Sequence, residues 1–315
     1  MVSPAHPLIE LRHLHRSFGT TKAVNDISFE VPAGAVFGYI GPNGAGKTTS
    51  MRILATLELP SAGDAFIDGF SVVQDPDRVR KRIGFMPDYF WTYPNINVWE
   101  YLDFFARAYG LVGRERQRSL THVMSFTGLD KLAEKPINGL SKGMKQRLCL
   151  GRTMIHDPAV LILDEPAAGL DPRARIELRE MIRQLAADGK SILVSSHILT
   201  ELAEMCDRVA IVELGQLVAV GTVAEIQRKL QPHRTVQVRV LNDAANAARW
   251  LEARSDINGI TVTEDLIRFN HEGDRISEAA LLKEMVLAEM QVVEFSAYSQ
   301  SLEEVFLQVT RGAVQ

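Results

Sequence analysis

The chain has 315 residues, of which 46% are hydrophobic and 23% are charged, and its formal net charge is −4. This composition fits a globular protein with room for two domains, and the acidic balance argues against a nucleic-acid partner. No apolar run of about 18 residues occurs, and residues 1–7 lack the apolar core of a signal peptide, so neither a membrane span nor a leader is expected. Cys149 and Cys206 have no metal-ligand spacing and are expected to be buried thiols in a reducing compartment.

From residue 8 to residue 230, strand-like apolar runs alternate with amphipathic helices such as 174–188. Three short runs alternate polar and apolar residues and predict an antiparallel layer: 8–11, 23–31 and 64–67. Three continuous apolar runs are typical of buried strands: 35–40, 160–163 and 191–194. The alternation predicts an α/β fold with a largely parallel central sheet.

Directly after the run at 35–40, the chain matches G-x-x-x-x-G-K-[ST], the P-loop pattern that holds nucleotide phosphates. The residues are Gly41, Pro42, Asn43, Gly44, Ala45, Gly46, Lys47, Thr48 and Thr49. Glycines let backbone N–H groups come close to a polyphosphate, Lys47 adds a cation, and the Thr48 hydroxyl is placed to bind Mg²⁺. A helix predicted over 48–57 would direct its positive end at the phosphates. The pattern predicts nucleotide binding, but kinases, GTPases, helicases and transporters all share it.

The apolar run at 160–163 ends in two carboxylates, Asp164 and Glu165. The carboxyl end of a buried strand lies beside the P-loop in open α/β sheets, so Asp164 can hold Mg²⁺ there. Glu165 would then lie near the γ-phosphate and could orient or deprotonate the attacking water. The competing interpretation is a strand followed by a solvated acidic turn.

Near residues 231–233 the pattern changes. The remaining chain predicts, in order, a strand at 236–240, a helix at 243–254, a hairpin at 260–270, a helix at 274–290 and a strand at 291–295. The order β-α-β-β-α-β is that of a small ferredoxin-like α+β domain. Ser301 and Glu304 form a capping-box pattern that predicts one last helix.

The segment from Leu140 to Arg147 resembles the signature motif of a known family. It reads LSKGMKQR and resembles the signature of the ATP-binding cassette (ABC) family, approximately L-S-G-G-Q followed by a helix. In that family the motif acts in trans, on ATP held by the P-loop of a second cassette. The resemblance therefore implies that Ser141, Lys142 and Gly143 contact ATP across a homodimer, although Lys142 stands where the family has Gly. Without the other motifs, a plain helix cap would explain Ser141 equally well.

Other segments follow in the family's order. Asp171 matches the D-loop, which signals across the dimer, and His197 matches the switch histidine that contacts the γ-phosphate. Phe18 matches the aromatic residue that stacks on adenine, although a Phe before a Gly could also be a core residue. Asp88 stands where the family usually has Gln at the Q-loop. As a carboxylate it is a stronger Mg²⁺ ligand than an amide, and we expect it to link nucleotide state to a partner. The alternative is that Asp88 sits in an exposed loop.

Nine of the 21 residues from 89 to 109 are aromatic. Helical spacing places Trp99, Leu102 and the pair Phe105 and Ala106 on a core-facing side. Tyr and Trp are also the residues that anchor interfaces. In the family this stretch helps to form the groove that receives a short helix of the membrane subunit. Core packing and docking are both expected, for different residues.

The resemblance implies an ATPase subunit that powers a separate membrane-spanning permease, cytoplasmic and peripheral on the inner face of the cell membrane. It implies an ABC domain over 1–232, with a helical subdomain at about 89–145, and an accessory α+β domain over 233–315. The C-terminal run 301–307 resembles the ending of the type-two bacterial exporters of drugs, sodium or polysaccharide.

Two other functions compete with transport. A soluble ABC ATPase would act on ribosomes or nucleic acid, but such members carry two cassettes or a long coiled coil, and this chain has neither. A regulatory module would bind ATP without hydrolysing it, and the presence of Lys47, Asp164, Glu165 and His197 argues against that.

Overall fold

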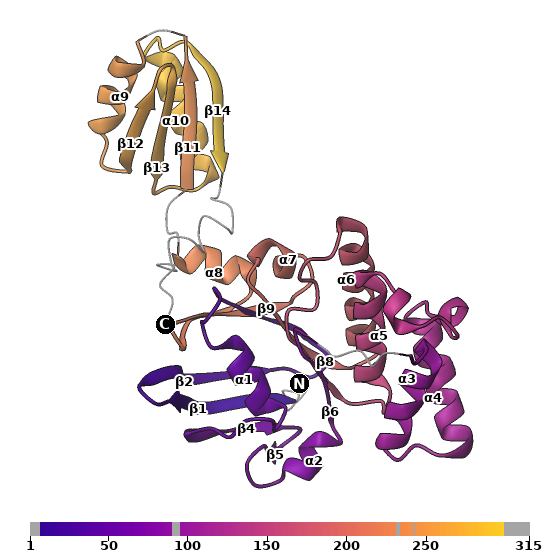
Figure 1. The fold of residues 1–315 in the computed structure, drawn as a ribbon. Coiled ribbons are helices and arrows are strands. Elements are labelled where there is room, and N and C mark those ends of the chain that lie inside the picture. Colours follow the sequence, from indigo (N-terminus) through magenta and orange to yellow (C-terminus); the bar gives the residue numbers. More distant parts are fainter. Residues whose placement is uncertain (1–6, 90–94, 231–233, 242, 299–315) are drawn as a thin grey trace, which may run out of the picture. The chain divides into compact units, whose positions relative to one another are not determined.

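The computed structural model describes residues 7–89, 95–230, 234–241 and 243–298 (Figure 1). The described residues divide into two compact units, with the division between Val223 and Ala224. The domain boundary expected from the sequence, at 232/233, falls just after helix α8, and it stays a prediction.

The first unit contains an antiparallel sheet in the order β2-β1-β4-β5. Its strands are β1 (Ile9–Phe18), β2 (Thr21–Val31), β4 (Ala62–Ile67) and β5 (Phe70–Ser71). Ile9 pairs with Val31 on one side and with Ile67 on the other, and all three side chains are buried. The predicted antiparallel layer is therefore present, with its first strand longer than the sequence pattern suggested.

The second sheet has the order β10-β9-β3-β8-β7-β6. Its strands are β3 (Val36–Ile40), β6 (Ile83–Met86), β7 (Val160–Leu163), β8 (Ser191–Ser196), β9 (Arg208–Glu213) and β10 (Gln216–Gly221). All neighbours run parallel except β9 and β10. Every residue of β3, β7 and β8 is buried, as continuous apolar runs require when helices cover both faces. The predicted parallel sheet is confirmed, and it brings the ends of β3, β7 and β8 to one edge.

Six helices of the described residues connect or follow these strands. They are α1 (Lys47–Leu54), α2 (Pro76–Arg80), α5 (Lys142–Met154), α6 (Pro172–Ala187), α7 (Leu199–Ala203) and α8 (Val223–Leu230). Helix α1 is shorter than the predicted 48–57, because Thr56 adopts a left-handed conformation with φ of 58°. Of the two cysteines, Cys149 on α5 is buried as expected, whereas Cys206 is only partly buried.

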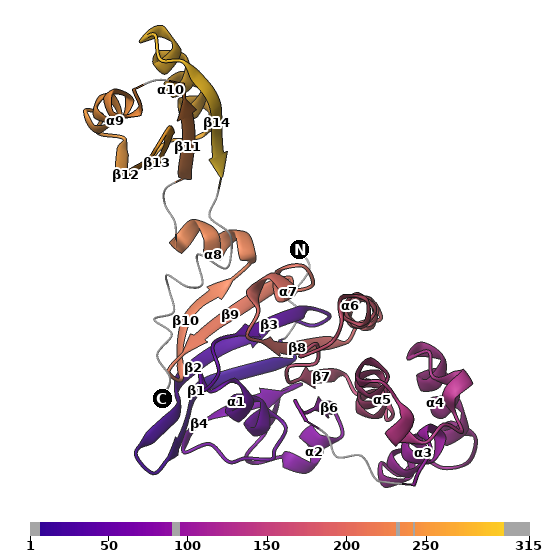
Figure 2. The same cartoon turned by 45° about the horizontal axis from the view of Figure 1, so that its top comes forward.

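A helical group stands beside the sheets in both views (Figures 1 and 2). It consists of α3 (Val98–Ala108), α4 (Gly113–Phe126) and two short 3₁₀ turns, η1 (Asp130–Leu132) and η2 (Ile137–Gly139), and it packs on α5. Tyr101, Leu102 and Ala106 on α3 are fully or almost fully buried. Trp99 was expected in the core but is 38% exposed, because it lies one position off the stripe formed by Val98, Leu102 and Ala106.

The second unit is a four-stranded antiparallel sheet in the order β12-β13-β11-β14. Its elements are β11 (Arg234–Val240), α9 (Ala244–Glu252), β12 (Ile257–Thr263), β13 (Leu266–His271), α10 (Arg275–Leu287) and β14 (Val292–Tyr298). The unit has its own core, which includes Val236, Val238, Phe269, Leu281 and Met285. The predicted ferredoxin-like order is confirmed. The helix expected from Ser301 lies outside the described residues.

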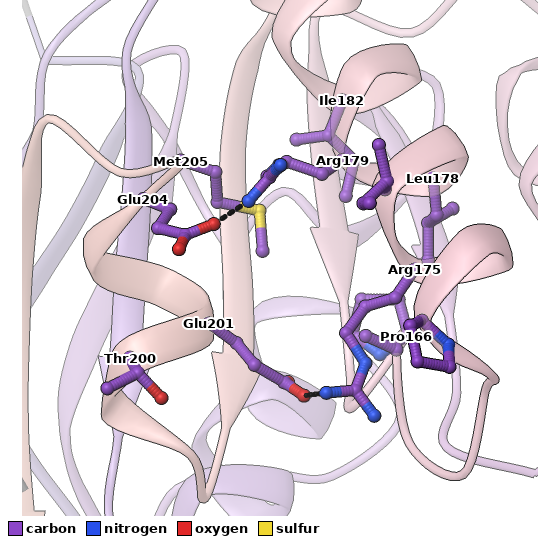
Figure 3. Close-up of a pocket in the computed structure, with 12 residues that line it drawn as sticks. Pro166, Arg175, Leu178, Arg179, Ile182, Thr200, Glu201, Glu204 and Met205 are labelled. Carbon is purple, nitrogen blue, oxygen red and sulfur yellow. Dashed lines mark ion pairs between the residues drawn. The ribbon is translucent and has the colours of Figure 1, made fainter.

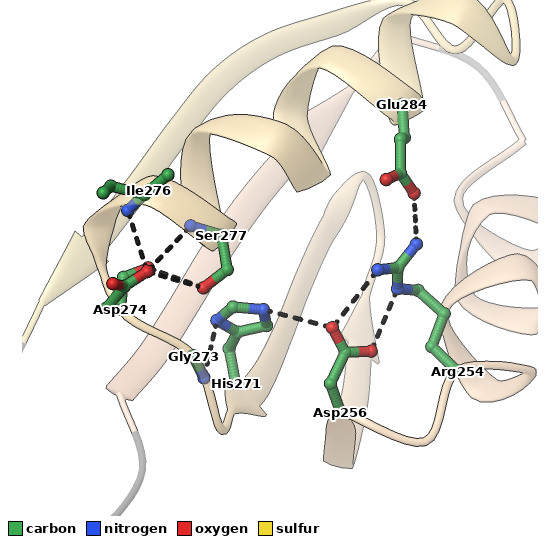
Figure 4. A network of polar contacts seen from close by, with 8 residues as sticks. All are labelled: Arg254, Asp256, His271, Gly273, Asp274, Ile276, Ser277 and Glu284. Atoms are coloured by element: carbon green, nitrogen blue, oxygen red, sulfur yellow. Dashed lines mark hydrogen bonds and ion pairs between the residues drawn. The ribbon is translucent and has the colours of Figure 1, made fainter.

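A polar network ties the helices of the second unit to its sheet (Figure 4). Arg254, just after α9, pairs with Asp256 at 3.0 Å and with Glu284 on α10. The hydrogen bonds from Arg254 lower the pKa of Asp256. Asp256 in turn faces Nε2 of the fully buried His271 at 3.4 Å. The network joins elements far apart in sequence and so helps to fix the fold of this unit.

Candidate nucleotide-binding site

The P-loop connects β3 to α1, and its backbone is in close contact with neighbouring strands. A Cβ atom on Gly41 would lie 2.3 Å from the carbonyl oxygen of Val212 on β9. Gly46, with φ of 96°, leaves 2.1 Å between such an atom and the carbonyl oxygen of Ala23 on β2. Only glycine fits at these two positions, so the loop is held by the strands around it as well as by its own sequence. The Gly215 N–H also donates to the Ala45 carbonyl at 3.2 Å.

Lys47 is buried, and its ammonium group is held inside the loop. Nζ donates to the carbonyl oxygens of Gly41 at 2.6 Å and Pro42 at 3.2 Å, and it lies 3.5 Å from Oε1 of Glu165. Burial lowers the pKa of Lys47, while the charge of Glu165 acts in the opposite direction. A desolvated cation with one partly exposed counter-ion is well prepared to exchange that partner for a phosphate.

Asp164 stands at the end of β7, where its carboxyl group is buried. The Ser195 hydroxyl donates to Oδ1 at 2.6 Å, whereas Oδ2 is buried with no hydrogen-bond partner among the described residues. Burial raises the pKa of Asp164, and the hydrogen bond from Ser195 together with the nearby Thr48 hydroxyl opposes that rise. An unsatisfied buried carboxylate oxygen near the Thr48 hydroxyl is a chemically suitable pair of ligands for a hard divalent cation.

Glu165 adopts a left-handed backbone conformation, with φ of 49°, which is uncommon for a residue other than glycine. Its N–H donates to the Ser195 hydroxyl at 2.8 Å. Its Oε2 lies 2.9 Å from Nδ1 of His197, the residue that follows β8. The turn after β7 therefore places one carboxylate between the P-loop lysine and the histidine. Strained backbone of this kind persists where neighbouring contacts hold it, often at functional sites.

A hollow of about 390 Å³ opens over the P-loop. It is lined by Phe18, Thr21, Ala23, the loop from Asn43 to Thr49, Asp88 and Glu165. The Phe18 ring is 47% exposed, and the Arg16 guanidinium lies 4.5 Å from its centre, so Phe18 is not a core residue. Asp88 is exposed and accepts a hydrogen bond from the N–H of Tyr89 at 2.8 Å. The structure thus brings together the P-loop, Phe18, Asp88 and Glu165.

The remaining predicted site residues lie elsewhere in the unit. Ser141 caps α5 by accepting a hydrogen bond from the Met144 N–H at 3.3 Å, and Lys142 and Gly143 form the first turn of that helix. Asp171 caps α6 through the Ala174 N–H at 3.0 Å. These two helix starts are neighbours, since a Cβ atom on Gly143 would lie 3.0 Å from Cβ of Ala174. None of them is among the described residues that line the hollow over the P-loop.

Ser195 was not expected from the sequence, although it contacts both Asp164 and Glu165. The signal that could have found it is the polar pair Ser195 and Ser196 directly after the apolar residues Ile192 to Val194. Thr21 and Ala23, which also line the hollow, carry no sequence signal of their own.

A parallel sheet with a P-loop after one strand and a carboxylate pair after a neighbouring strand defines a P-loop ATPase with the ABC arrangement of motifs. Comparisons with known proteins agree with this class. The ABC transporter family matches residues 24–168, and the C-terminal domain family of ATP-binding protein DrrA1-3-like matches residues 221–310.

Similar proteins cover most of the chain. The Nod factor export ATP-binding protein I of Ralstonia nicotianae is 36% identical over 70% of this chain and 68% of its own length. The linearmycin resistance ATP-binding protein LnrL of Bacillus subtilis is 29% identical over 96% of this chain and 98% of its own length. A solved ATP-binding subunit of an ABC transporter is 32% identical, covers 70% of this chain and 92% of the solved chain, and superposes with a TM-score of 0.65. The chain belongs to the ABC transporter ATP-binding proteins and is an ATPase subunit of that family.

Proposed function

We propose that this ATPase works as a homodimer of cassettes that closes on ATP and drives a separate membrane-spanning permease. The observation that carries the proposal is the position of Glu165, between the P-loop lysine and His197. Glu165 would accept the proton of the attacking water, and His197 would orient that carboxylate and contact the γ-phosphate. Phe18 would stack on adenine, and Asn43 to Thr49 would cradle the phosphates.

Mg²⁺ is proposed as the cofactor that accompanies ATP. Thr48 and Asp164 would hold it, with Asp88, which also lines the hollow, as a further ligand. When bound, the ion neutralises phosphate charge and fixes the phosphates in place. The unpartnered Oδ2 of Asp164 supports this assignment.

The separation of two sets of residues supports the proposed dimer. Ser141, Lys142, Gly143 and Asp171 do not line the hollow over their own P-loop in the described part of the chain. In a head-to-tail pair, the start of α5 would face the nucleotide on the second copy, where its free N–H groups suit a phosphate. Each ATP would then be enclosed by two chains, and hydrolysis would reopen them.

A second hollow, of about 320 Å³, supports docking of a membrane partner. It lies between the sheet and the helical group, and its lining includes Leu57, Phe85, Phe105, Tyr109 and Arg152. Leu57 is 58% exposed and Tyr109 45%, so apolar surface is available for a partner helix. Phe90, Trp91 and Tyr93 of the aromatic run lie outside the described residues.

The permease is proposed to lie on separate chains, because the matching family and relatives are ATP-binding proteins of transporters. The described residues include no helix with the length and apolar character to span a bilayer. The proposed location is the cytoplasmic face of the cell membrane. Export is the proposed direction, because the relatives named above are an export protein and a resistance protein.

The test is co-purification of the chain with the product of its neighbouring membrane gene, followed by ATP hydrolysis in detergent and in vesicles. A complex whose ATPase rate depends on the membrane subunit supports the proposal. Association with ribosomes or nucleic acid, and none with a membrane subunit, supports the soluble alternative instead.

A further inference from the structure

A groove of about 380 Å³ separates helices α6 and α7, next to the residues that follow β7 (Figure 3). Its walls carry apolar side chains such as Leu178, Ile182 and Met205, and two ion pairs cross it. Both pairs join an arginine of α6 to a glutamate of the α7 segment. The two ion pairs therefore bridge the groove and link the two helices there.

The ion pair nearer the nucleotide-binding site, between Arg175 and Glu201, connects the predicted D-loop with the loop that carries the predicted switch histidine. Arg175 places Nη1 at 2.8 Å from Oε1 of Glu201, and its Nη2 donates to the carbonyl oxygen of Leu170 at 3.2 Å. Leu170 directly precedes Asp171, the predicted D-loop residue. The other carboxylate oxygen of Glu201 accepts from the Ser196 hydroxyl at 3.3 Å, and Ser196 directly precedes His197. Arg175 and Glu201 therefore form a continuous polar connection from the D-loop to the switch histidine.

The surroundings make this connection stiff. The Glu201 side chain is only 9% exposed, and Ser196 is buried. The Ser196 hydroxyl also accepts from the Ile198 N–H at 3.0 Å, so it holds the backbone on both sides of His197. Removing Arg175 would leave a largely buried carboxylate without its cation and would release the Leu170 carbonyl at the same time.

We propose that Arg175 and Glu201 are positioning residues that fix the switch histidine relative to the D-loop, so that a D-loop displaced by a second cassette moves His197 and with it Glu165. The inference rests on the proposed roles of Asp171, His197 and Glu165. Neither Arg175 nor Glu201 touches the P-loop hollow in the described structure, so the pair acts through the turnover step and leaves ATP binding unchanged.

The chain supplies a matched control one helical turn away. Arg179 pairs with Glu204 across the same groove, from the same two segments, as Figure 3 shows. Among the described residues, Arg179 and Glu204 make no hydrogen bond or ion pair with Leu170, Asp171 or Ser196. Breaking this second pair removes a similar inter-helix ion pair without touching the connection.

The experiment measures steady-state ATP hydrolysis by the full chain for R175A, E201A and R175A/E201A, and for R179A, E204A and R179A/E204A. We expect kcat to fall about 10-fold or more in the first set with an unchanged KM for ATP, because small displacements of catalytic groups cost rate and not affinity. The double variant should be no slower than either single variant, since both remove one connection. The second set should stay within about twofold of wild type.

Thermal unfolding of all six variants separates positioning from stability. Loss of kcat in the first set alone, in variants whose Tm stays well above the assay temperature, supports the proposal. An R175A protein with wild-type kcat, or with a loss equal to that of R179A, overturns it. E165Q is assayed in parallel: if E165Q hydrolyses ATP normally, the site assignment itself fails, whereas an inactive E165Q beside a normal R175A rejects the positioning role alone.

Discussion

Replacing Glu165 with Gln changes one oxygen of the side chain to an NH₂ group and keeps its shape. Oε1 lies 3.5 Å from Nζ of Lys47 and Oε2 lies 2.9 Å from Nδ1 of His197, so an amide can occupy the same place. The amide group, however, cannot take a proton from the attacking water. Loss of a general base slows a reaction by about 100- to 10,000-fold, or ~3–5 kcal/mol of transition-state free energy. We expect a loss of kcat in that range.

The same substitution should strengthen ATP binding. The Glu165 carboxylate would compete with phosphate for the Lys47 ammonium, because the two groups lie 3.5 Å apart and their side chains are 15% and 6% exposed. Neutralising a partly exposed ion pair of this kind is worth about 1 kcal/mol, which corresponds to roughly five- to tenfold tighter binding.

The assay pairs phosphate release with light scattering on a sizing column in ATP and Mg²⁺. E165Q should bind ATP, release phosphate at a background rate and elute as a dimer, while the wild-type protein returns to monomer as ATP is consumed. A variant that hydrolyses ATP within a few-fold of wild type refutes the base assignment. A slow variant with weakened ATP binding refutes the competition between Glu165 and phosphate for Lys47.

Three further outcomes are expected. Lys47→Ala should abolish ATP binding in a fluorescence-nucleotide titration, because the only buried cation lining the described hollow is lost; binding that persists would reject its role. Asp88→Ala should lower both ATPase rate and transport coupling in the reconstituted complex, and two unchanged values would assign Asp88 to a plain exposed loop. His156→Gln tests a linkage: burial lowers the pKa of His156 in the folded protein, so the unfolded chain binds its proton first as pH falls. Wild-type Tm should therefore drop more steeply than that of H156Q below pH 6.5, the ordinary histidine value; parallel curves would refute this.

Much of the fold and part of the site could be predicted because their signals are local. The P-loop, the carboxylates after β7 and the Ser141 cap each depend on residues a few positions apart, and the period of the apolar residues separates strands from helices. The sequence could not show contacts made across the fold. Ser195 reaches Asp164 from a strand 31 residues on, and no local pattern fixes which serine does so. In the sequence, Arg175 and Glu201 resemble ordinary surface charges, because their pairing depends on how α6 and α7 pack in the fold.

Trp99 shows another limit of pattern reading. A helical stripe is wide enough that a residue at its margin fits the period, and only the packed neighbours decide whether it is covered. Trp99 is 38% exposed although Tyr101, two residues on, is buried. Its exposed fraction depends on where α4 and α5 lie.

Among the described residues, the second unit has a core of its own, which includes Phe269 and Leu281. A genetic exchange near the division would leave each core with its full set of buried side chains. The extent of similarity differs between relatives in a related way: the Ralstonia protein aligns over 70% of the chain, whereas LnrL aligns over 96%.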